Sequence, residues 1–313
     1  TDIDNSHNIH VYEGYLYIVG ADTYDIWIYD LSIPSNPEFI GAWDGEYIHD
    51  LEVYNDKAYA MGIYSSTAYI IDVSDKSNPT TIVSWQYPGM AHDCAVSPDE
   101  RYLITADEMQ GGYVRMWNIE DYNNITEVGY FIGDPAHSVH NIYIKDDFLY
   151  ASWYADGTRI FDISQPDNIV EIARYDTSEI EGLYVGNWGV YVYLPSGNII
   201  SSDMETGLYV MKLGGLTINH APLNDLVLGE EININATVDS FGGDGVNYIN
   251  IFYSFGEDWF FSEMDFEDDV WSYVIPSPSY PTLISYYFEI IPENATDEGD
   301  VFDYPSGGES NPL

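Results

Sequence analysis

The 313-residue chain has a single cysteine, Cys94, and only eight lysines and arginines against 53 acidic residues. One cysteine excludes an internal disulfide framework, so packing must hold the fold together. Cys94 lies in an apolar strand pattern, which predicts an inert buried thiol. The net charge of −45 excludes a basic nucleic-acid footprint and disfavours an anionic membrane surface. The sequence has no run of 18 apolar residues, so we expect no membrane span in it.

A charge of this size repels itself unless salt or cations screen it. Two settings fit: the acidic surface of a salt-adapted, halophilic organism, or an extracellular protein loaded with calcium. The two can overlap. The sequence shows neither an initiator methionine nor a signal peptide, so we interpret it as a mature or excised fragment whose anchor lies elsewhere.

Recognisable catalytic motifs are also missing. The sequence contains no G-x-S-x-G element, no Walker loop, no Cys/His metal knuckle and no dinucleotide fingerprint. Since no nucleophile–base pair can be picked out either, an enzyme is the less favoured class.

What the sequence does contain is an internal repeat. Four similar strand openings each have a histidine in the equivalent position, and a fifth opening has a tryptophan there. Successive members of this series are 42, 43, 48 and 48 residues apart. The five residues are His7, His49, His92, His140 and Trp188. A second landmark follows in each repeat, as in "IWIYDLSIPSNP", "AYIIDVSDKSNP" and "TRIFDISQPDN". We expect its Asp30, Asp72 and Asp162 to cap the turn that leaves the strand.

Within each repeat, short alternating strands are separated by turns rich in Gly, Asn, Asp and Pro. Three or four strands in 42 to 48 residues are typical of one β-propeller blade. We therefore predict an all-β chain with a propeller of five recognisable blades over residues 1–213.

The remaining residues change character. The Gly/Pro-punctuated stretch 214–222 is predicted to be a linker, and residues 293–313 a polar tail. Between them, residues 223–292 contain alternating strands at a spacing of about ten residues, which predicts a small β-sandwich. Without a cysteine pair, a fibronectin type III-like version is favoured over an immunoglobulin one.

The strand ends "IWIYD", "AYIID" and "TRIFD" resemble LVIVD repeats. The longer stretches "SPDERYLITADE" and "HNIYIKDDFLYASWYADGTRIFDIS" are similar to the choice-of-anchor B family of secreted surface proteins, over residues 6–213. This resemblance implies an extracellular or cell-surface propeller and implies no defined reaction. Relatives carry further repeats upstream of the first opening, which leaves the blade count open.

The first strand of each propeller blade lines the central channel, so the repeated histidines should converge at one end of it. Imidazoles bind zinc, copper, iron or nickel, and neighbouring carboxylates can orient them. The predicted metal-site residues are His7, His49, His92, His140, Asp50 and Asp93. Alternatively, the Asp and Asn oxygens hold calcium.

A structural interpretation competes with the metal site. Each histidine would then hydrogen-bond to the backbone of a neighbouring blade, and would recur because the same corner recurs. Asp107 and Glu108, at the end of a strand, could add carboxylates to the same channel mouth, although with 53 acidic residues a solvated turn is the favoured interpretation.

We therefore expect an extracellular scaffold or adhesion protein whose partners are other surface proteins, glycans or further copies of itself. The fifth repeat stops near Lys212 without a full outer strand, and unpaired strand edges promote pairing between chains. This predicts head-to-tail filaments in which the C-terminal domain or tail of one copy contacts the propeller of the next. The alternative is a metal-dependent hydrolase or lyase acting on an extracellular polymer.

Overall fold

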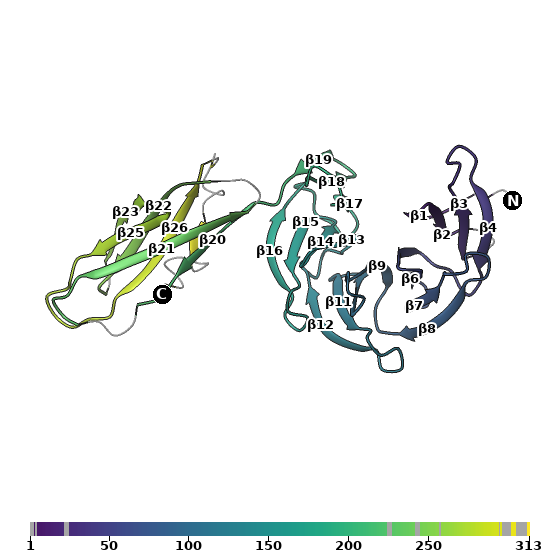
Figure 1. Cartoon of the computed structure of the whole chain (residues 1–313), viewed down its shortest axis with the longest axis horizontal. Helices are drawn as coiled ribbons and strands as arrows, with labels where there is room; N and C mark the ends of the chain where they lie inside the picture. The colour runs from purple at the N-terminus through teal and green to yellow at the C-terminus, as the bar shows by residue number, and fades with distance from the viewer. Residues whose placement is uncertain are drawn as a thin grey trace. The chain divides into compact units, whose positions relative to one another are not determined.

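The computed structural model describes residues 3, 5–21, 25–223, 227–241, 245–256, 258–293, 295, 302–304 and 312–313. Within these ranges every regular element is a β-strand, so the all-β expectation is confirmed (Figure 1). No helix among the described residues is long and apolar enough to cross a membrane. The chain forms two compact units, residues 1–211 and 212–313, which are described separately.

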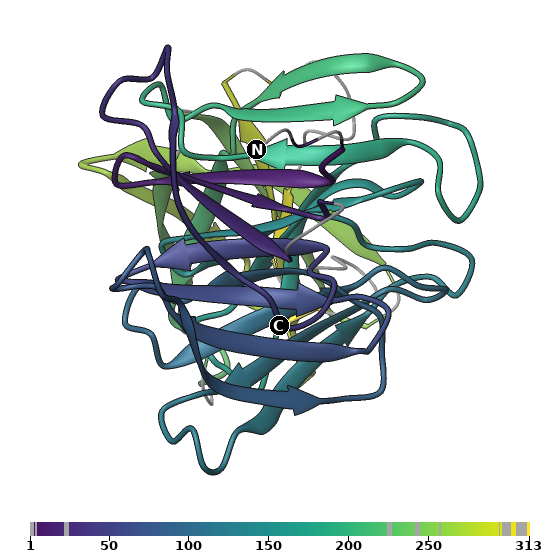
Figure 2. The same ribbon diagram turned by 90° about the vertical axis from the view of Figure 1, so that its right-hand side faces the viewer.

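The first unit consists of five antiparallel sheets in chain order, which we call sheets 1 to 5. In each of them the strands follow one another as a meander, and Figure 2 shows sheets 1 and 2 in purple and blue. The strands of sheets 1 and 2 are β1 (Asn8–Tyr12), β2 (Tyr15–Val19), β3 (Ile26–Asp30), β4 (Glu38–Trp43), β5 (Asp50–Tyr54), β6 (Lys57–Gly62), β7 (Thr67–Asp72) and β8 (Thr80–Gln86).

Sheets 3 and 4 also have four strands, whereas sheet 5 has three. Their strands are β9 (Ala91–Val96), β10 (Tyr102–Asp107), β11 (Tyr113–Asn118), β12 (Thr126–Ile132), β13 (Ile142–Lys145), β14 (Phe148–Trp153), β15 (Gly157–Asp162), β16 (Val170–Tyr175), β17 (Asn187–Tyr191), β18 (Ile199–Asp203) and β19 (Gly207–Met211). The predicted five repeats therefore correspond to five sheets, the last without a fourth strand among the described residues.

Apolar side chains between neighbouring sheets hold the first unit together. One cluster joins sheets 1 and 2 around Ile28 and Val53, and a second joins sheets 2 and 3 around Ile70 and Cys94. A third joins sheets 3 and 4. Cys94 is a buried free thiol, as predicted. Neighbouring sheets thus bury apolar faces against each other, which a single sheet of this size could not do alone.

The repeated aspartates cap their turns as expected. The carboxylates of Asp30, Asp72 and Asp162 accept hydrogen bonds from the backbone N–H two residues later, at 2.5, 2.8 and 2.8 Å. These bonds close the turn between the third and fourth strands of sheets 1, 2 and 4.

Replacing Asp162 with Ala should therefore lower the free energy of unfolding by about 1 kcal/mol, the usual net contribution of one such hydrogen bond. Urea unfolding followed by tryptophan fluorescence measures the change. Asp167→Ala, an exposed aspartate in the same turn, is the matched control and should leave stability nearly unchanged. Equal losses in the two variants would contradict the capping role.

The second unit has two four-stranded antiparallel sheets that share one core. Ile234 and Ile275 from one sheet and Ile251 and Phe288 from the other are fully buried in it. The strands are β20 (Gly215–His220), β21 (Ile232–Phe241), β22 (Val246–Ser254), β23 (Trp259–Glu263), β24 (Asp265–Glu267), β25 (Val270–Ile275), β26 (Ser285–Pro292) and β27 (Phe302–Tyr304).

The prediction of a linker over residues 214–222 is wrong for most of this stretch. Gly215–His220 forms β20, which pairs with β21 from Gly215↔Phe241 to His220↔Ala236. Ile218 is buried in the core, and the ring of His220 bonds to the Asn235 carbonyl and the Tyr286 hydroxyl, both at 2.8 Å. Glycines and a proline flank this strand, but its interior alternates and finds a long-range partner.

The predicted polar tail is ordered in part. Phe302–Tyr304 forms β27 beside β26, and the Leu313 N–H donates to the Tyr286 carbonyl at 2.8 Å. Leu313 also packs against the core. The rest of the predicted tail, residues 294, 296–301 and 305–311, lies outside the described residues.

Candidate metal centre

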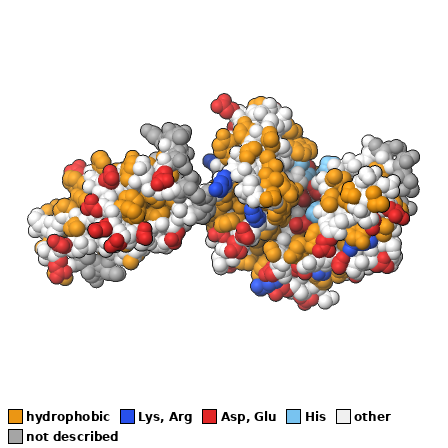
Figure 3. Space-filling model, turned by 45° about the horizontal axis from the view of Figure 1, so that its top comes forward, with side chains coloured by type: hydrophobic (Ala, Val, Ile, Leu, Met, Phe, Trp, Pro, Cys, Tyr) orange, Lys and Arg blue, Asp and Glu red, His pale blue; other side chains and the backbone are white. Residues whose placement is uncertain are grey.

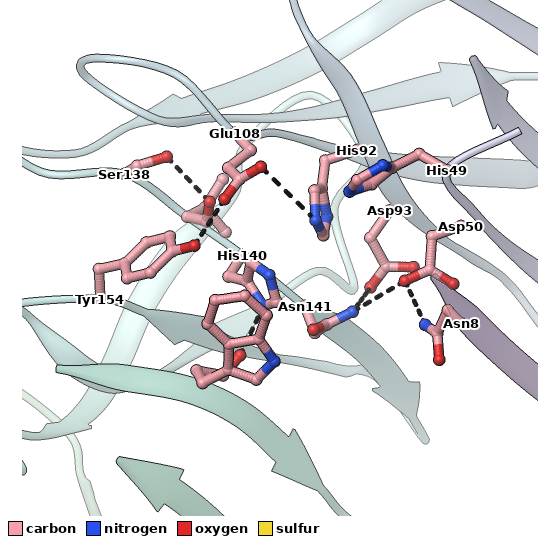
Figure 4. Close-up of polar contacts among 12 residues, drawn as sticks. Asn8, His49, Asp50, His92, Asp93, Glu108, Ser138, His140, Asn141 and Tyr154 are labelled. Atoms are coloured by element: carbon pink, nitrogen blue, oxygen red, sulfur yellow. Dashed lines mark hydrogen bonds and ion pairs between the residues drawn. The ribbon is translucent and has the colours of Figure 1, made fainter. Parts of the chain in front are cut away.

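The first strands of the sheets bring the repeated histidines to one place. Three of these histidines precede their strand and donate a backbone hydrogen bond of 2.8 to 2.9 Å to the second strand of the same sheet, as in His49 N–H to the Met61 carbonyl. His92 lies within β9 itself. Each imidazole therefore starts from a backbone position that strand pairing fixes. The rings of His49, His92 and His140 turn towards a shared space (Figure 4), and histidine side chains are visible in a hollow of the surface (Figure 3). The His7 ring lies beside those of His49 and His92.

The rings form a continuous arc. Ring centroids are 3.7 Å apart for His7 and His49, 4.6 Å for His49 and His92, and 4.4 Å for His92 and His140. The arc continues to the Trp188 ring, 4.2 Å from His140. The predicted convergence of the four histidines is thus observed, and their rings do not lie in separate interfaces between sheets.

Two groups of potential ligands share His92. The first is His7, His49 and His92, and the second is His92, Glu108 and His140; within each group the ligand atoms lie within 4.8 Å of one another. With ligand bonds of about 2.0 to 2.2 Å, two atoms bound to one zinc-type ion lie at most about 4.4 Å apart, so small side-chain movements would let either group close around an ion. His92 is the common member, and its position in the middle of the arc explains why.

The sequence favours a solvated turn for Glu108, and the predicted ligand set does not include this residue. It directly follows β10, the strand paired with β9, and its carboxylate lies 3.7 Å from Nε2 of His92. The Tyr154 hydroxyl donates to it at 2.5 Å. Its neighbour Asp107 turns away into an ion pair with Arg115 at 2.8 Å. Only the adjacency of β9 and β10 could have revealed this ligand.

His92 is 1% exposed, and neither of its ring nitrogens has a hydrogen-bond partner among the described residues. Burial, followed by the neighbouring imidazoles of His140, His49 and His7, lowers its pKa well below the usual value. A buried polar group without a partner is costly. The ring is therefore neutral at pH 7 and presents a lone pair to the shared space.

His140 is oriented by a backbone contact. Its Nδ1 lies 2.5 Å from the Trp188 carbonyl oxygen. Since a carbonyl only accepts, Nδ1 carries the proton, which leaves the lone pair on Nε2 for a ligand. This contact is the hydrogen bond to a neighbouring sheet that the structural interpretation expects. Here it also fixes the tautomer that a metal ligand needs.

Asp50 and Asp93 lie one residue further along their strands and form a separate layer with two asparagines (Figure 4). The Asn8 amide donates to Asp50 at 2.6 Å, and the Asn141 amide donates to Asp50 and Asp93 at 3.2 and 3.1 Å. Backbone N–H groups occupy further carboxylate oxygens. Neither aspartate belongs to the two ligand groups, so the prediction of Asp50 and Asp93 as metal ligands is corrected: their oxygens bind the N–H groups of this layer.

These carboxyls are held in an unusual state. Burial and the nearby Asp93 raise the pKa of Asp50 well above its usual value, and burial raises the pKa of Asp93 to about 7. Burial likewise raises the pKa of Glu52 to about 7. They line a cavity of about 590 Å³ that runs along the first strands and includes Tyr143 and Tyr191. Near pH 7 Asp93 and Glu52 are therefore only partly ionised, and the cavity wall carries less negative charge than its number of acidic residues suggests.

The remaining histidines have other partners. His137 lies between Asp156 and Glu181, at 2.9 and 2.8 Å; burial lowers its pKa, but these two carboxylates outweigh that and raise it. Nε2 of His10 accepts from the Val53 N–H at 3.4 Å. Neither belongs to the two groups of potential ligands, which contain four of the seven histidines.

The pKa shifts predict a pH dependence for the metal-free protein. Burial lowers the pKa of His140 to about 4, so between pH 6.5 and 4 the unfolded chain binds more protons than the folded one. Above pH 6.5 the depressed pKa of His140 therefore costs the folded state nothing, and on acidification it lowers the free energy of unfolding. In the His140→Gln variant, the free energy of unfolding should fall by about 2 kcal/mol less between pH 7 and 5 than in wild type.

Urea unfolding in EDTA at the two pH values provides the measurement. Because Asp93 and Glu52 change stability in the opposite direction over the same range, only the difference between variant and wild type is informative. Parallel curves for the two proteins would contradict a depressed pKa of His140.

Comparisons with known proteins agree with this fold. The LVIVD repeat family matches residues 5–44, 67–86 and 136–177. Of the curated proteins, none matches this chain. Among solved structures, a protein from Lactobacillus plantarum is similar with a TM-score of 0.56 and 15% identity, over 66% of this chain and 67% of that one.

Two further structures are similar. A chain of the mitotic checkpoint complex has a TM-score of 0.52 and 13% identity, over 66% of this chain and 61% of that one. A putative 6-phosphogluconolactonase from Bacteroides uniformis has a TM-score of 0.50 and 13% identity, over 65% and 70%. At these identities the likeness concerns the fold alone. The chain carries LVIVD repeats and has a β-propeller-like architecture.

Proposed function

We propose that this chain is the metal-binding propeller and accessory domain of an extracellular surface protein that acts as a scaffold or adhesion module. The observation that carries the proposal is His92, a fully buried imidazole whose two nitrogens accept or donate no hydrogen bond among the residues that the structure describes, and which lies among three other histidines and Glu108. A purely structural histidine would be expected to use at least one nitrogen in a hydrogen bond.

The finer fold assignment belongs to the same proposal. The five sheets are interpreted as five propeller blades, and the C-terminal unit as an immunoglobulin- or fibronectin-like sandwich. Five equivalent first strands along one channel support the first part, and two four-stranded sheets around a single core support the second. Membership of the choice-of-anchor B family rests on the quoted sequence stretches.

Nitrogen ligands favour a divalent transition metal over calcium. Imidazole suits zinc, copper and nickel, whereas calcium takes six to eight oxygens. Of the nearby carboxylates that the structure describes, only Glu108 belongs to a ligand group, and N–H donors already point at the oxygens of the Asp50–Asp93 layer. An ion bound by His7, His49 and His92 would join sheets 1, 2 and 3 at their first strands. Because it binds only the folded state, it would stabilise the scaffold.

The charge of the chain supports an extracellular, cation-rich setting. Five of the eight basic residues form ion pairs with carboxylates: Lys57, Lys76, Arg101, Arg115 and Arg159. That leaves little positive charge for nucleic acid or an anionic membrane. We propose other surface proteins, glycans or further copies as the partners.

Calorimetric titration of the EDTA-treated and desalted chain with zinc chloride tests the metal site. We expect one equivalent to bind with a dissociation constant in the micromolar range or below, and the unfolding temperature to rise with zinc concentration. His220→Gln, in the other unit, should behave as wild type. No saturable binding of zinc, copper or nickel would overturn the proposal.

A metal-dependent hydrolase or lyase is the second candidate, and Glu108 is the observation that favours it. A carboxylate beside a histidine-bound ion can act as general base towards a metal-bound water. Turnover of an extracellular glycan or ester by the zinc-loaded chain, lost in Glu108→Gln while zinc binding persists, would establish this candidate over the scaffold.

A further inference from the structure

The repeated sheets meet through one recurring interface. We call the residues two and four positions after the repeated His or Trp the leading face of a sheet. In sheets 2 to 5 this pair faces the preceding sheet. Four such pairs are at most 6% exposed: Leu51 and Val53, Cys94 and Val96, Ile142 and Ile144, and Val190 and Val192. In the first two cases the pair packs on the second and third strands of the preceding sheet.

The leading face of sheet 1 is uncovered. Its residues, by the same spacing from His7, are Ile9 and Val11, and each is 58% exposed. They are the same kind of side chain as the buried pairs. Their position on β1 corresponds to that of Leu51 and Val53 on β5.

The opposite face of each sheet, which we call the trailing face, receives the next sheet. Strand pairing defines it by four residues of the second and third strands: Tyr17, Val19, Ile26 and Ile28 in sheet 1 correspond to Ile200, Ser202, Leu208 and Val210 in sheet 5. The sheet 1 set is at most 1% exposed, whereas Leu208 and Val210 are 70% and 62% exposed. Sheet 5 therefore presents an uncovered trailing face.

We propose that sheet 5 of one copy packs on sheet 1 of a second copy, so that the chain associates head-to-tail through Leu208 and Val210 on one side and Ile9 and Val11 on the other. The two uncovered faces are the complementary halves of an interface that the chain builds four times within itself. These halves do not cover each other among the described residues, and a second copy is the proposed occupant because each of its two faces matches the one that covers the equivalent face between neighbouring sheets. The proposal does not depend on metal binding.

Such an interface is heterologous, because each copy contributes a different face and keeps the other one free. It propagates into rings or filaments instead of stopping at a dimer. The surface differs from the one expected from the sequence, in which the C-terminal domain or tail made the contact. With a net charge of −45 per copy, association needs salt, and at about 1 M the Debye length falls to about 3 Å.

Two double variants test this proposal in the full chain. Ile9→Ser with Val11→Ser removes the leading face, and Leu208→Ser with Val210→Ser removes the trailing face. Val170→Ser with Ile172→Ser is the matched control, since these residues are of the same types and are exposed on β16. Sedimentation velocity in EDTA, over a range of protein concentration and at about 0.1 and 2 M NaCl, measures association.

Wild type and control should form species beyond the dimer that grow with concentration and salt. Each face variant alone should associate at least about 100-fold more weakly. Mixed in equal amounts, the two face variants should form a 1:1 complex and stop there, because each retains the face that the other lacks. A wild type that stays monomeric under all conditions, or face variants that polymerise like the control, would overturn the proposal. Either result would leave the zinc titration unaffected.

Discussion

Replacing His92 with Ala should abolish stoichiometric zinc binding, with an apparent affinity more than about 100-fold below wild type. His92 is the one residue that belongs to both ligand groups, so its loss leaves His7 with His49 on one side and Glu108 with His140 on the other. Two ligands on each side do not make the three- or four-coordinate site that zinc requires. Competition with a chromogenic zinc chelator measures the affinity.

The same substitution should cost little stability in EDTA. It removes a buried ring whose nitrogens have no partner among the described residues, so the loss of packing is offset by the loss of an unsatisfied polar group. His10→Asn is the control, because His10 lines the same channel outside both ligand groups. Wild-type zinc affinity in His92→Ala, or equal losses in both variants, would contradict the ligand assignment.

Replacing Arg159 with Ala should destabilise the first unit by about 3 to 5 kcal/mol, the range for removing one partner of a buried ion pair. The guanidinium is buried and bonds to Asp156 at 3.1 Å and to Glu171. It also lies 4.6 Å from the Trp153 ring centroid. Among the described residues, no other lysine or arginine pairs with these two carboxylates, and of the histidines only His137 contacts Asp156.

Thermal and urea unfolding followed by tryptophan fluorescence would show the loss. Arg101→Ala is the matched control, since Arg101 pairs with Glu120 at 3.0 Å on the exposed surface, where solvent screens the pair. Its unfolding midpoint should remain close to wild type. A similarly small shift for Arg159→Ala would show that burial does not strengthen this ion pair.

Local repetition made much of the first unit predictable from sequence. Each opening combines a turn signal with alternating residues, so short-range patterns predict strands such as those of sheet 2, between His49 and Asp72. The convergence of the histidines was also predictable, because a common position in each repeat becomes a common position along the channel. The aspartate-capped turns depend only on residues two apart.

Contacts between distant segments were not predictable. Gly215–His220 looked like a linker because its partner strand, β21, lies beyond an intervening loop. Glu108 joins the candidate metal centre only because β10 pairs with β9. Asp50 and Asp93 are not part of it, because Asn141 from a third sheet binds both. No sequence pattern shows which of several acidic residues points at an imidazole.

The uncovered faces are a further case. Ile9 and Val11 follow the same sequence pattern as Leu51 and Val53, so the sequence predicts the same burial for both pairs. Only the arrangement of the sheets shows that one pair is buried and the other exposed.

The most direct test of the metal centre is anomalous diffraction at the zinc absorption edge from crystals of the full chain grown with one equivalent of zinc. We expect one strong peak in the shared space of the histidine arc, about 2.0 to 2.2 Å from ligand atoms of at least three of His7, His49, His92, His140 and Glu108. Peaks only at surface carboxylates, with none at His92, would contradict the account and make the histidine arc a structural feature of the repeats.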